Sequence, residues 1–235
     1  MSIADNLALV RERVAAAATR AKRDPSSVAL MAVSKTFPAP AVREAYAAGQ
    51  RLFGENRVQE FAGKHAEVQS LPDLEFHLIG HLQSNKAVKA AELFTAVDSV
   101  DSLRLAERLN EAAAKLNKTL PVLIEINVGG EQQKAGVAPN SDELEQILSA
   151  APRLANLSFR GTMTIPPFTE DPEQARPYFA RLRQLRDELA KRHLQSVSFD
   201  VLSMGMSHDF EIAIEEGSTC VRVGTAIFGV REKAQ

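Results

Sequence analysis

The sequence predicts an α/β protein folded as a single (β/α)8 barrel, or TIM barrel, with one extra helix at its N-terminus. Eight short apolar segments typical of buried strands alternate with segments of helical periodicity, which implies a parallel sheet with helical crossovers. Eight such units in 235 residues match a closed barrel, and no linker or change in composition marks a second domain within residues 1–235. An open, doubly wound sheet is the alternative architecture.

The expected strands are short apolar runs bounded by glycine, proline or polar residues. The first run, A-L-M-A-V-S-K, is followed at once by Thr36-Phe37-Pro38. The eight runs cover residues 29–35, 51–54, 75–79, 94–97, 121–128, 157–164, 199–202 and 219–223.

The expected helices have apolar residues at spacings of three and four, or carry residues typical of helix ends. Ile3, Leu7, Val10 and Val14 mark a helix before the first strand. Further helices are expected over about 40–48, 56–69 and 84–91, after Asp101 as a cap, after Asn140 with Glu143 completing a capping box, after Asp171, over 209–216 and, as a final turn, over 225–228.

Composition excludes several classes of function. The formal net charge is -2 with no long block of like charges, which argues against nucleic acid or an anionic membrane as the main partner. Cys220 is the single cysteine, so we expect no intramolecular disulfide, no multi-cysteine metal site and a buried, inert thiol. No signal peptide is recognisable, and no apolar run approaches the roughly 20 residues of a membrane span. We therefore expect a soluble, cytoplasmic protein.

Polar residues collect where the predicted strands end. In a barrel these ends share one face, which is the active-site face. The residues are Ser34, Lys35, Glu55, Asn56, His81, Asp98, Ser99, Asn127, Met163, Thr164, Ser203, Ser207, Gly224 and Thr225.

Lys35 lies at the end of the first predicted strand, where an ammonium is costly unless it has a function. The alternative is a lysine that extends to the surface from a strand end. The loops after the last two strands commonly form the phosphate site of this fold. Here Gly224 permits close approach of the backbone to an anion, Thr225 adds a hydroxyl, and Ser203 or Ser207 adds another from the neighbouring loop.

A lysine opposite a phosphate site indicates a Schiff base with a phosphorylated aldehyde or ketone. Two classes fit this chemistry: a lysine aldolase acting on a sugar phosphate, and a protein that holds pyridoxal phosphate. Arg222, two residues before Gly224, would meet the ring nitrogen of such a cofactor if its side chain points inward. An outward-pointing Arg222 paired with a surface acid is the alternative.

These residues resemble a known family, the YggS/PROSC type of pyridoxal phosphate homeostasis protein. The resemblance runs in order from about residue 29 to 229. Its motifs are A-V-S-K (32–35), F-G-E-N-R-V-Q-E (53–60), H-L-I-G-H-L-Q-S-N-K (77–86), V-D-S-V (97–100), E-I-N-V (125–128), G-T-M-T-I (161–165), L-S-M-G-M-S-H-D (202–209) and V-R-V-G-T-A-I-F-G (221–229). Thr36-Phe37-Pro38 departs from the polar or basic residues often found after the lysine, which alters the expected pocket rim.

The resemblance implies a barrel of the alanine-racemase type (fold type III of pyridoxal phosphate proteins) with the cofactor held as a Schiff base on Lys35. Arg222 would face the ring nitrogen, while Ser203 or Ser207, Gly224 and Thr225 would hold the phosphate. Asn56, His81 and Met163 would line the pocket. The family is linked to vitamin B6 balance, so a carrier or buffer that serves apoenzymes accepting the cofactor is expected, with no catalytic residue and no metal.

Physical chemistry agrees with little or no turnover. An arginine at the ring nitrogen disfavours its protonation, which weakens the ring as an electron sink. Racemization also needs a second acid or base, and Tyr46 and Tyr178 lie in predicted helices away from the strand ends. Lys134 is a candidate second aldehyde trap or a plain loop lysine. A stand-alone amino-acid racemase is the rival hypothesis, and a monomer is the expected state.

Overall fold

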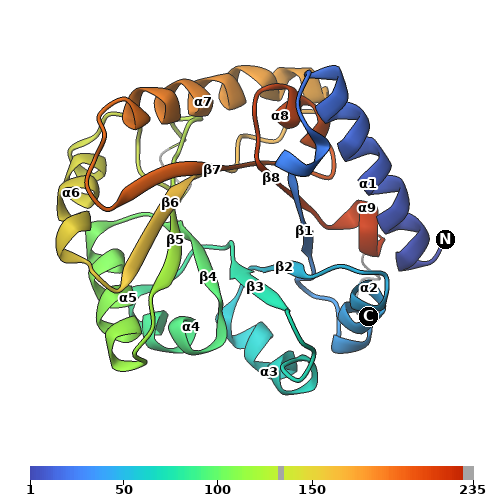
Figure 1. Ribbon diagram of the computed structural model, residues 1–235, viewed down its shortest axis with the longest axis horizontal. Helices are drawn as coiled ribbons and strands as arrows, with labels where there is room; N and C mark the ends of the chain where they lie inside the picture. The colour runs from blue at the N-terminus through green and yellow to red at the C-terminus, as the bar shows by residue number, and fades with distance from the viewer. Residues whose placement is uncertain (132–134, 230–235) are drawn as a thin grey trace.

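Eight parallel strands close into a barrel in the order β1 to β8, with β8 paired to β1 (Figure 1). The computed structural model describes residues 1–131 and 135–229. The closed barrel confirms the predicted fold class over the open sheet. The strands are β1 (Ala29–Val33), β2 (Leu52–Glu55), β3 (Glu75–Leu78), β4 (Ala96–Val100), β5 (Leu120–Glu125), β6 (Leu157–Met163), β7 (Val197–Met206) and β8 (Cys220–Val223).

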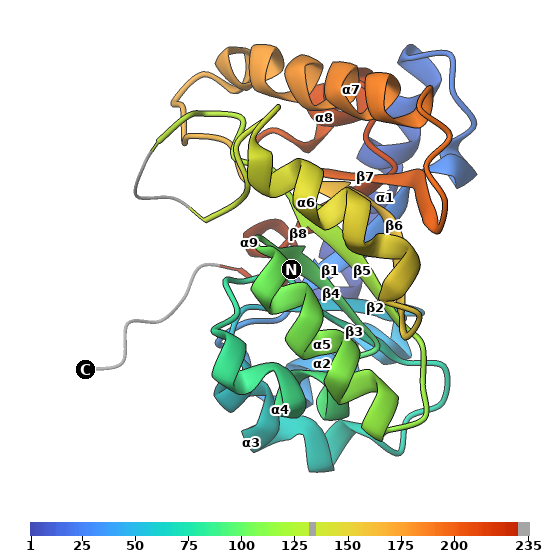
Figure 2. The same ribbon diagram turned by 90° about the vertical axis from the view of Figure 1, so that its left-hand side faces the viewer.

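Helices form a layer outside the strands, and Figure 2 shows α4 to α7 stacked along one side of the barrel. The α-helices are α1 (Ile3–Arg20), α2 (Ala39–Ala47), α3 (Val58–Val68), α4 (Ala87–Leu93), α5 (Leu103–Lys115), α6 (Asp142–Ala150), α7 (Arg176–Ala190), α8 (Phe210–Glu215) and α9 (Thr225–Phe228). Short 3-10 turns are η1 (Pro25–Ser27), η2 (Ser84–Lys86), η3 (Ala151–Arg153) and η4 (Pro172–Ala175).

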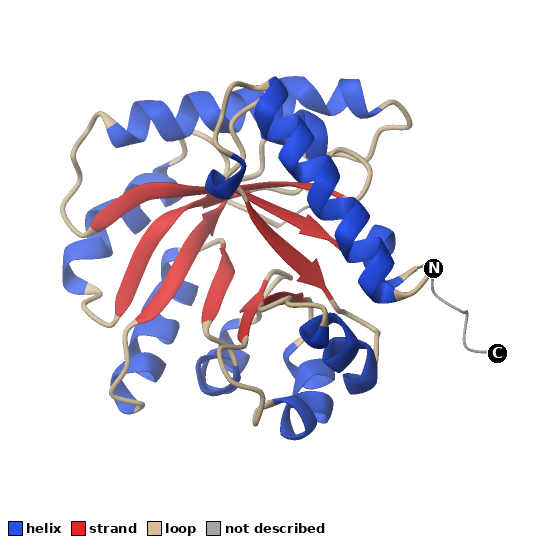
Figure 3. Ribbon diagram, turned by 45° about the vertical axis from the view of Figure 1, so that its right-hand side comes forward, coloured by secondary structure: helices blue, strands red, loops and turns tan. Residues whose placement is uncertain are grey.

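The extra N-terminal helix is present as α1, which packs on the β8 and β1 side of the barrel beside α8 and α9 (Figure 3). Leu7, Val10 and Val14 are buried, as the spacing predicts. Arg20 bonds to Glu211 of α8 at 2.7 Å, which joins the first helix to the segment that follows β7.

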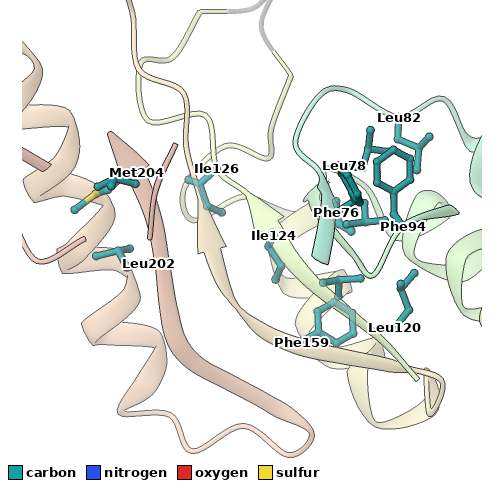
Figure 4. Close-up of a cluster of buried hydrophobic side chains, with 14 of the residues drawn as sticks. Phe76, Leu78, Leu82, Phe94, Leu120, Ile124, Ile126, Phe159, Leu202 and Met204 are labelled. Carbon is teal, nitrogen blue, oxygen red and sulfur yellow. The ribbon is translucent and has the colours of Figure 1, made fainter. Parts of the chain in front are cut away.

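The main apolar core lies between strands and helices (Figure 4). Its aromatic centre is Phe61 of α3, whose ring centroid is 4.4 Å from that of Phe76 and 4.8 Å from that of Phe94. Val221 and Val223 of β8 belong to this outer core. Because side chains alternate along a strand, Cys220 and Arg222 point into the barrel.

The inside of the barrel is partly polar. Met31, Val33, Ile79 and Cys220 form a small apolar cluster there. Strand alternation also directs His77, Asp98 and Glu125 inward, and His77 Nδ1 lies 3.2 Å from Asp98 Oδ2. The thiol of Cys220 is buried as predicted, and burial raises its pKa to about 12.

Two predicted helix starts are wrong by one residue. The cap of α6 is Ser141, whose hydroxyl accepts the N–H of Leu144, whereas Asn140 adopts a φ of 58° outside the helix. The cap of α5 is Ser102 in place of Asp101. In both cases two good capping residues are adjacent, and local sequence does not decide between them.

Some strand ends also differ from expectation. β7 continues to Met206, so Ser203 lies in the strand and not in a loop, and Asp98 and Ser99 lie within β4. β5 ends at Glu125, and the predicted helix over 84–91 is a 3-10 turn followed by α4. In the described part of the chain, no helix is both long enough and apolar enough to cross a bilayer.

Candidate functional site

A cavity of about 270 Å³ opens at the carboxyl ends of the strands, between β1, β7 and β8. It combines a lysine, a guanidinium, hydroxyls and an apolar wall. The lining residues are Val33, Lys35, Asn56, Ile79, Ile165, Met206, Ser207, His208, Arg222, Gly224 and Thr225. Of the predicted site residues, the structure thus brings together Lys35, Asn56, Ser207, Arg222, Gly224 and Thr225.

Lys35 lies in a tight turn directly after β1. The N–H of Phe37 donates to the carbonyl of Ser34 at 3.1 Å, which closes a four-residue turn with Lys35 in second place. Thr36, in third place, has a φ of 66°. A positive φ at the third position is the mark of a type II turn, where glycine is usual and a β-branched residue is strained.

Arg222 is 2% exposed and is held inside the barrel mouth by two hydrogen bonds. Its Nη1 donates to Ser203 Oγ at 2.6 Å, and its Nη2 donates to the carbonyl of Thr164 at 2.7 Å. Burial lowers the pKa of Arg222, and nearby acids, including Asp98 and Glu125, oppose this effect. The inward orientation is therefore the correct one of the two that the sequence left open.

Ser207, Gly224 and Thr225 lie together at the β8 side of the cavity. The hydroxyl of Ser207 accepts the N–H of Gly224 at 3.1 Å and that of Ala226 at 3.5 Å. Two backbone donors therefore converge on one oxygen, beside the hydroxyl of Thr225. This arrangement is suited to an anion with several acceptor oxygens.

Asn56 enters the cavity wall because the chain after β2 passes close to Gly80. A Cβ added at Gly80 would lie 2.3 Å from the carbonyl oxygen of Asn56, so no larger residue fits there. The close approach explains the glycine of the H-L-I-G-H motif.

Three predicted site residues lie elsewhere. Met163 and Ser203 are fully buried and are not among the lining residues, and Ser203 is engaged by Arg222. His81 is 59% exposed at its side chain, and its Nδ1 lies 2.9 Å from Asp101 Oδ2. It lines a separate groove, with Asp101 and Arg104. Contact of these three with a ligand stays a prediction.

Sequence reasoning missed the apolar part of the wall. Ile79, Ile165, Met206 and His208 line the cavity, and the exposed ring of Phe168 lies 5.7 Å from that of His208. All four stand in motifs quoted above, but Ile79, Ile165 and Met206 resemble ordinary core residues, whereas His208 carries a polar ring that could have been singled out.

Glu125 is a buried carboxyl group close to this site. It is 5% exposed, and its Oε2 has no hydrogen-bond partner within the described residues. Burial raises the pKa of Glu125 to about 7; Asp101 adds to this effect, and Arg222 and His81 reduce it. This carboxyl group therefore changes its protonation state near neutral pH.

The remaining sequence hypotheses concern Tyr46, Tyr178 and Lys134. Tyr46 lies in α2, where the Arg51 guanidinium is 3.9 Å from its ring centroid, and Tyr178 lies in α7. Neither tyrosine lines the cavity. Lys134 lies outside the described residues. Within the described ranges, no group of three or more His, Cys, Asp or Glu side chains is placed to hold a metal ion.

Comparison with known proteins finds similarity over the whole chain. The family model of the alanine racemase N-terminal domain matches residues 6–232. The pyridoxal phosphate homeostasis protein of Pseudomonas aeruginosa is 48% identical over 231 residues, covering 98% of this chain and 96% of that protein. The pyridoxal phosphate homeostasis protein of Aquifex aeolicus is 45% identical over 232 residues, covering 99% of this chain and 100% of that protein.

Solved structures are also similar to this chain. PipY of Synechococcus elongatus PCC7942, solved with PLP bound, matches with a TM-score of 0.82 and 42% identity, over 97% of this chain and 100% of that chain. An alanine racemase of Clostridium difficile matches with a TM-score of 0.71 over 97% of this chain and 58% of the racemase chain. At 16% identity the racemase is similar in fold alone.

Proposed function

The chain belongs to the pyridoxal phosphate homeostasis proteins of the alanine racemase N-terminal domain family, and we propose that it binds pyridoxal 5'-phosphate through a Schiff base on Lys35. We further propose that it acts as a carrier or buffer of this cofactor with little or no turnover. One observation carries the proposal: a single cavity combines Lys35 with Arg222 and with Ser207, Gly224 and Thr225.

The donors of this cavity fit the cofactor at both ends. At one end, the hydroxyls of Ser207 and Thr225 suit a phosphate, and the N–H groups of Gly224 and Ala226, which donate to Ser207 Oγ, orient the Ser207 hydroxyl as a donor. At the other, Lys35 supplies an amine for the aldehyde. Ile79 and Ile165 provide apolar walls for a flat ring.

Arg222 supports a role without turnover. Pyridoxal phosphate supplies an aldehyde for amines and a ring that withdraws electrons best when its nitrogen is protonated. A guanidinium facing that nitrogen disfavours the proton, because two positive charges would meet at short range. Ser203 and the Thr164 carbonyl fix the guanidinium in place.

The rival function is that of a stand-alone amino-acid racemase, which the alanine-racemase fold keeps open. Racemization needs an acid or base on each face of the substrate. Tyr46 and Tyr178 are both outside the cavity. His208 is the imidazole that lines the cavity, and it is the group that a racemase mechanism would have to use as its second acid or base.

Transfer of the cofactor to apoenzymes, cytoplasmic location and a monomeric state stay predictions. The cavity mouth supports the first of these. Lys35 is half-buried, and Ile165 and Phe168 are exposed at 39% and 80% beside the opening. A ligand held there is accessible from the mouth of the barrel.

The test is reconstitution of the purified protein with pyridoxal phosphate. We expect a near-visible absorption band that borohydride bleaches, with the reduced adduct found on Lys35 by peptide mass spectrometry. Lys35→Ala is expected to abolish the band and to retain weaker, phosphate-dependent binding. The matched control is Lys89→Ala, which removes an exposed lysine that pairs with Glu92. A colourless wild type with no adduct on Lys35 would refute the proposal.

The same reconstituted protein tests the rival. Wild-type protein is incubated with alanine and other amino acids in deuterated water, and the Cα position is examined by mass spectrometry. Steady, multiple-turnover exchange would establish the racemase. Activation of an acceptor apoenzyme by the loaded protein, faster than by the free cofactor released from it, is the expected result for a carrier.

A further inference from the structure

Side chains of helix α3 form hydrogen bonds to the backbone of the turn that carries Lys35. Thr36 in this turn has a φ of 66°, a backbone region that β-branched residues rarely adopt. Such a conformation persists only where surrounding contacts impose it. Three charged side chains of β2 and α3 make those contacts.

Lys64 of α3 bonds to both ends of the turn. Its Nζ donates to the carbonyl of Ser34 at 2.8 Å and to the carbonyl of Phe37 at 2.9 Å. These are the first and fourth residues of the turn, so one ammonium fixes the two residues that flank Lys35 and Thr36. Glu60, one helical turn before Lys64, accepts the N–H of Thr36.

Glu55 completes the set at the end of β2. Its Oε1 accepts a hydrogen bond of 2.6 Å from the hydroxyl of Ser34 and lies 2.7 Å from Lys64 Nζ. Strand alternation directs Glu55 outward, because Phe53 of the same strand packs in the outer core. The pair therefore lies between the barrel wall and α3, and not in the cavity.

The burial of this pair is unusual. Lys64 is 7% exposed and Glu55 is fully buried. Burial raises the pKa of Glu55, and Lys64 and Ser34 oppose the rise. A buried ion pair is a costly way to stabilise a protein, and an apolar pair of similar size often serves stability as well. The position of this ion pair is better explained by a role in holding the turn in one conformation than by a contribution to stability.

We propose that Glu55, Glu60 and Lys64 form a clamp that positions Lys35 for reaction with the bound aldehyde. The clamp is defined by these three residues, none of which lines the cavity. The inference rests on the proposed function, since it assumes that Lys35 forms the Schiff base. The clamp holds the backbone at Ser34, Thr36 and Phe37, and this determines the direction in which the Lys35 side chain leaves the barrel wall.

The expected effect on the rate of Schiff-base formation follows from misplacing Lys35 relative to the aldehyde. A small misplacement of a reacting group slows reaction by about ten- to a hundred-fold. Weakening the clamp is thus expected to slow formation of the Schiff base and to lower the fraction of bound cofactor that is held as the Schiff base. Binding of the phosphate end, which depends on Ser207, Gly224 and Thr225, is expected to change little.

The experiment compares Lys64→Met, Glu60→Ala and the control Lys89→Met, which removes an exposed ion-paired lysine of α4. Each apoprotein is mixed with pyridoxal phosphate, and the near-visible band is followed by stopped flow. Borohydride trapping at Lys35 gives the Schiff-base fraction, and equilibrium dialysis gives total bound cofactor. We expect about tenfold or slower band formation in both clamp variants, with nearly unchanged total binding, and wild-type rates in the control.

A second substitution separates positioning from stability. Asparagine adopts a positive φ far more readily than threonine, so Thr36→Asn reduces the need for a clamp. In the Glu60→Ala background, Thr36→Asn is expected to restore the rate of band formation without needing to restore the melting temperature. Glu60 is half-buried, so this pair keeps the test available if Lys64→Met does not fold.

The outcomes are distinct. If the wild type forms no adduct on Lys35, the proposed function fails. If the wild type forms it, and Glu60→Ala forms it at the wild-type rate, the clamp is overturned. A slower rate that follows only a loss of melting temperature, with no rescue by Thr36→Asn, also overturns the clamp and leaves the proposed function standing.

Discussion

The guanidinium of Arg222 donates a 2.6 Å hydrogen bond to the hydroxyl of Ser203. Both side chains are buried, and the bond joins β8 to β7 at the floor of the cavity. Of the two serines that the sequence offers for phosphate binding, Ser203 thus contacts the arginine, whereas Ser207 contacts the backbone at Gly224 and Ala226. The two hydroxyls are therefore expected to affect different ends of a bound cofactor.

Replacing Arg222 tests its effect on the ring nitrogen. Arg222→Gln retains a donor for Ser203 and Thr164 but removes the charge. Loss of a nearby positive charge is expected to raise the pKa of the ring nitrogen by about one to three units. Protein loaded with nitrogen-15-labelled cofactor is titrated by NMR, and solvent deuterium exchange into alanine is measured in parallel. An unchanged nitrogen signal with unchanged exchange would mean that Arg222 does not face the ring.

Glutamate is less suitable than glutamine at this position. Asp98, Glu125 and Asp209 all interact favourably with the buried Arg222 charge. A fourth carboxylate there would lack a counter-charge in a site of low solvent access, and the variant would be expected to unfold. Ser203→Ala is the companion variant, since it removes a hydrogen bond to the guanidinium and leaves its charge in place.

Replacing Ser207 tests the phosphate site. Ser207→Ala is expected to weaken pyridoxal phosphate binding by about tenfold or more, because a hydrogen bond to a charged group contributes about 1.5–3 kcal/mol. Ser203→Ala is expected to change this affinity less. The measurement is a fluorescence titration of each apoprotein with pyridoxal phosphate and with pyridoxal. If Ser207→Ala weakened both ligands equally, its hydroxyl would not act on the phosphate.

The sequence is sufficient to predict the barrel because its signals are local and repeated. Each apolar run and each amphipathic helix is detectable on its own, and eight alternations leave few topologies. The position of Lys35 follows from the same pattern, since it ends the first run. The inward orientation of Arg222 does not follow from the pattern alone, because it depends on Val221 and Val223 facing the helices.

The role of each serine was beyond the sequence for a physical reason. β7 runs to Met206, and its pairing with β8 shifts register between Ser203 and Met206. A shift of this kind changes which side chains face the cavity. Gly205, with a φ of 92°, lies within it, but a glycine in S-M-G-M-S fits a loop turn as well as a bulge inside a strand. Lys64 was missed because a lysine in an amphipathic helix is ordinary. Its burial depends on contact with a turn 30 residues earlier in the chain.

Glu125 predicts a specific dependence of stability on pH. The folded state raises the pKa of Glu125 from 4.5 to about 7, so the folded state holds this proton more tightly than the unfolded state does. The corresponding stability is present below about pH 4.5 and is lost as pH rises through about 7, which amounts to about 3 kcal/mol for this group. Glu125→Gln cannot lose a proton, so its stability is expected to fall less over this interval.

The measurement is urea unfolding of apoprotein from pH 5 to pH 8, for wild type and Glu125→Gln. His77 contributes to both proteins alike: burial lowers its pKa, but Asp98 and Glu75 outweigh burial and raise it to about 9. Its share of the stability is lost at higher pH, between about 6.5 and 9, so it cancels in the difference. The difference between the two proteins should therefore grow in favour of Glu125→Gln between pH 5 and pH 8. Parallel curves would show that Glu125 is already ionised at pH 5, and that its buried oxygen has a partner in solution.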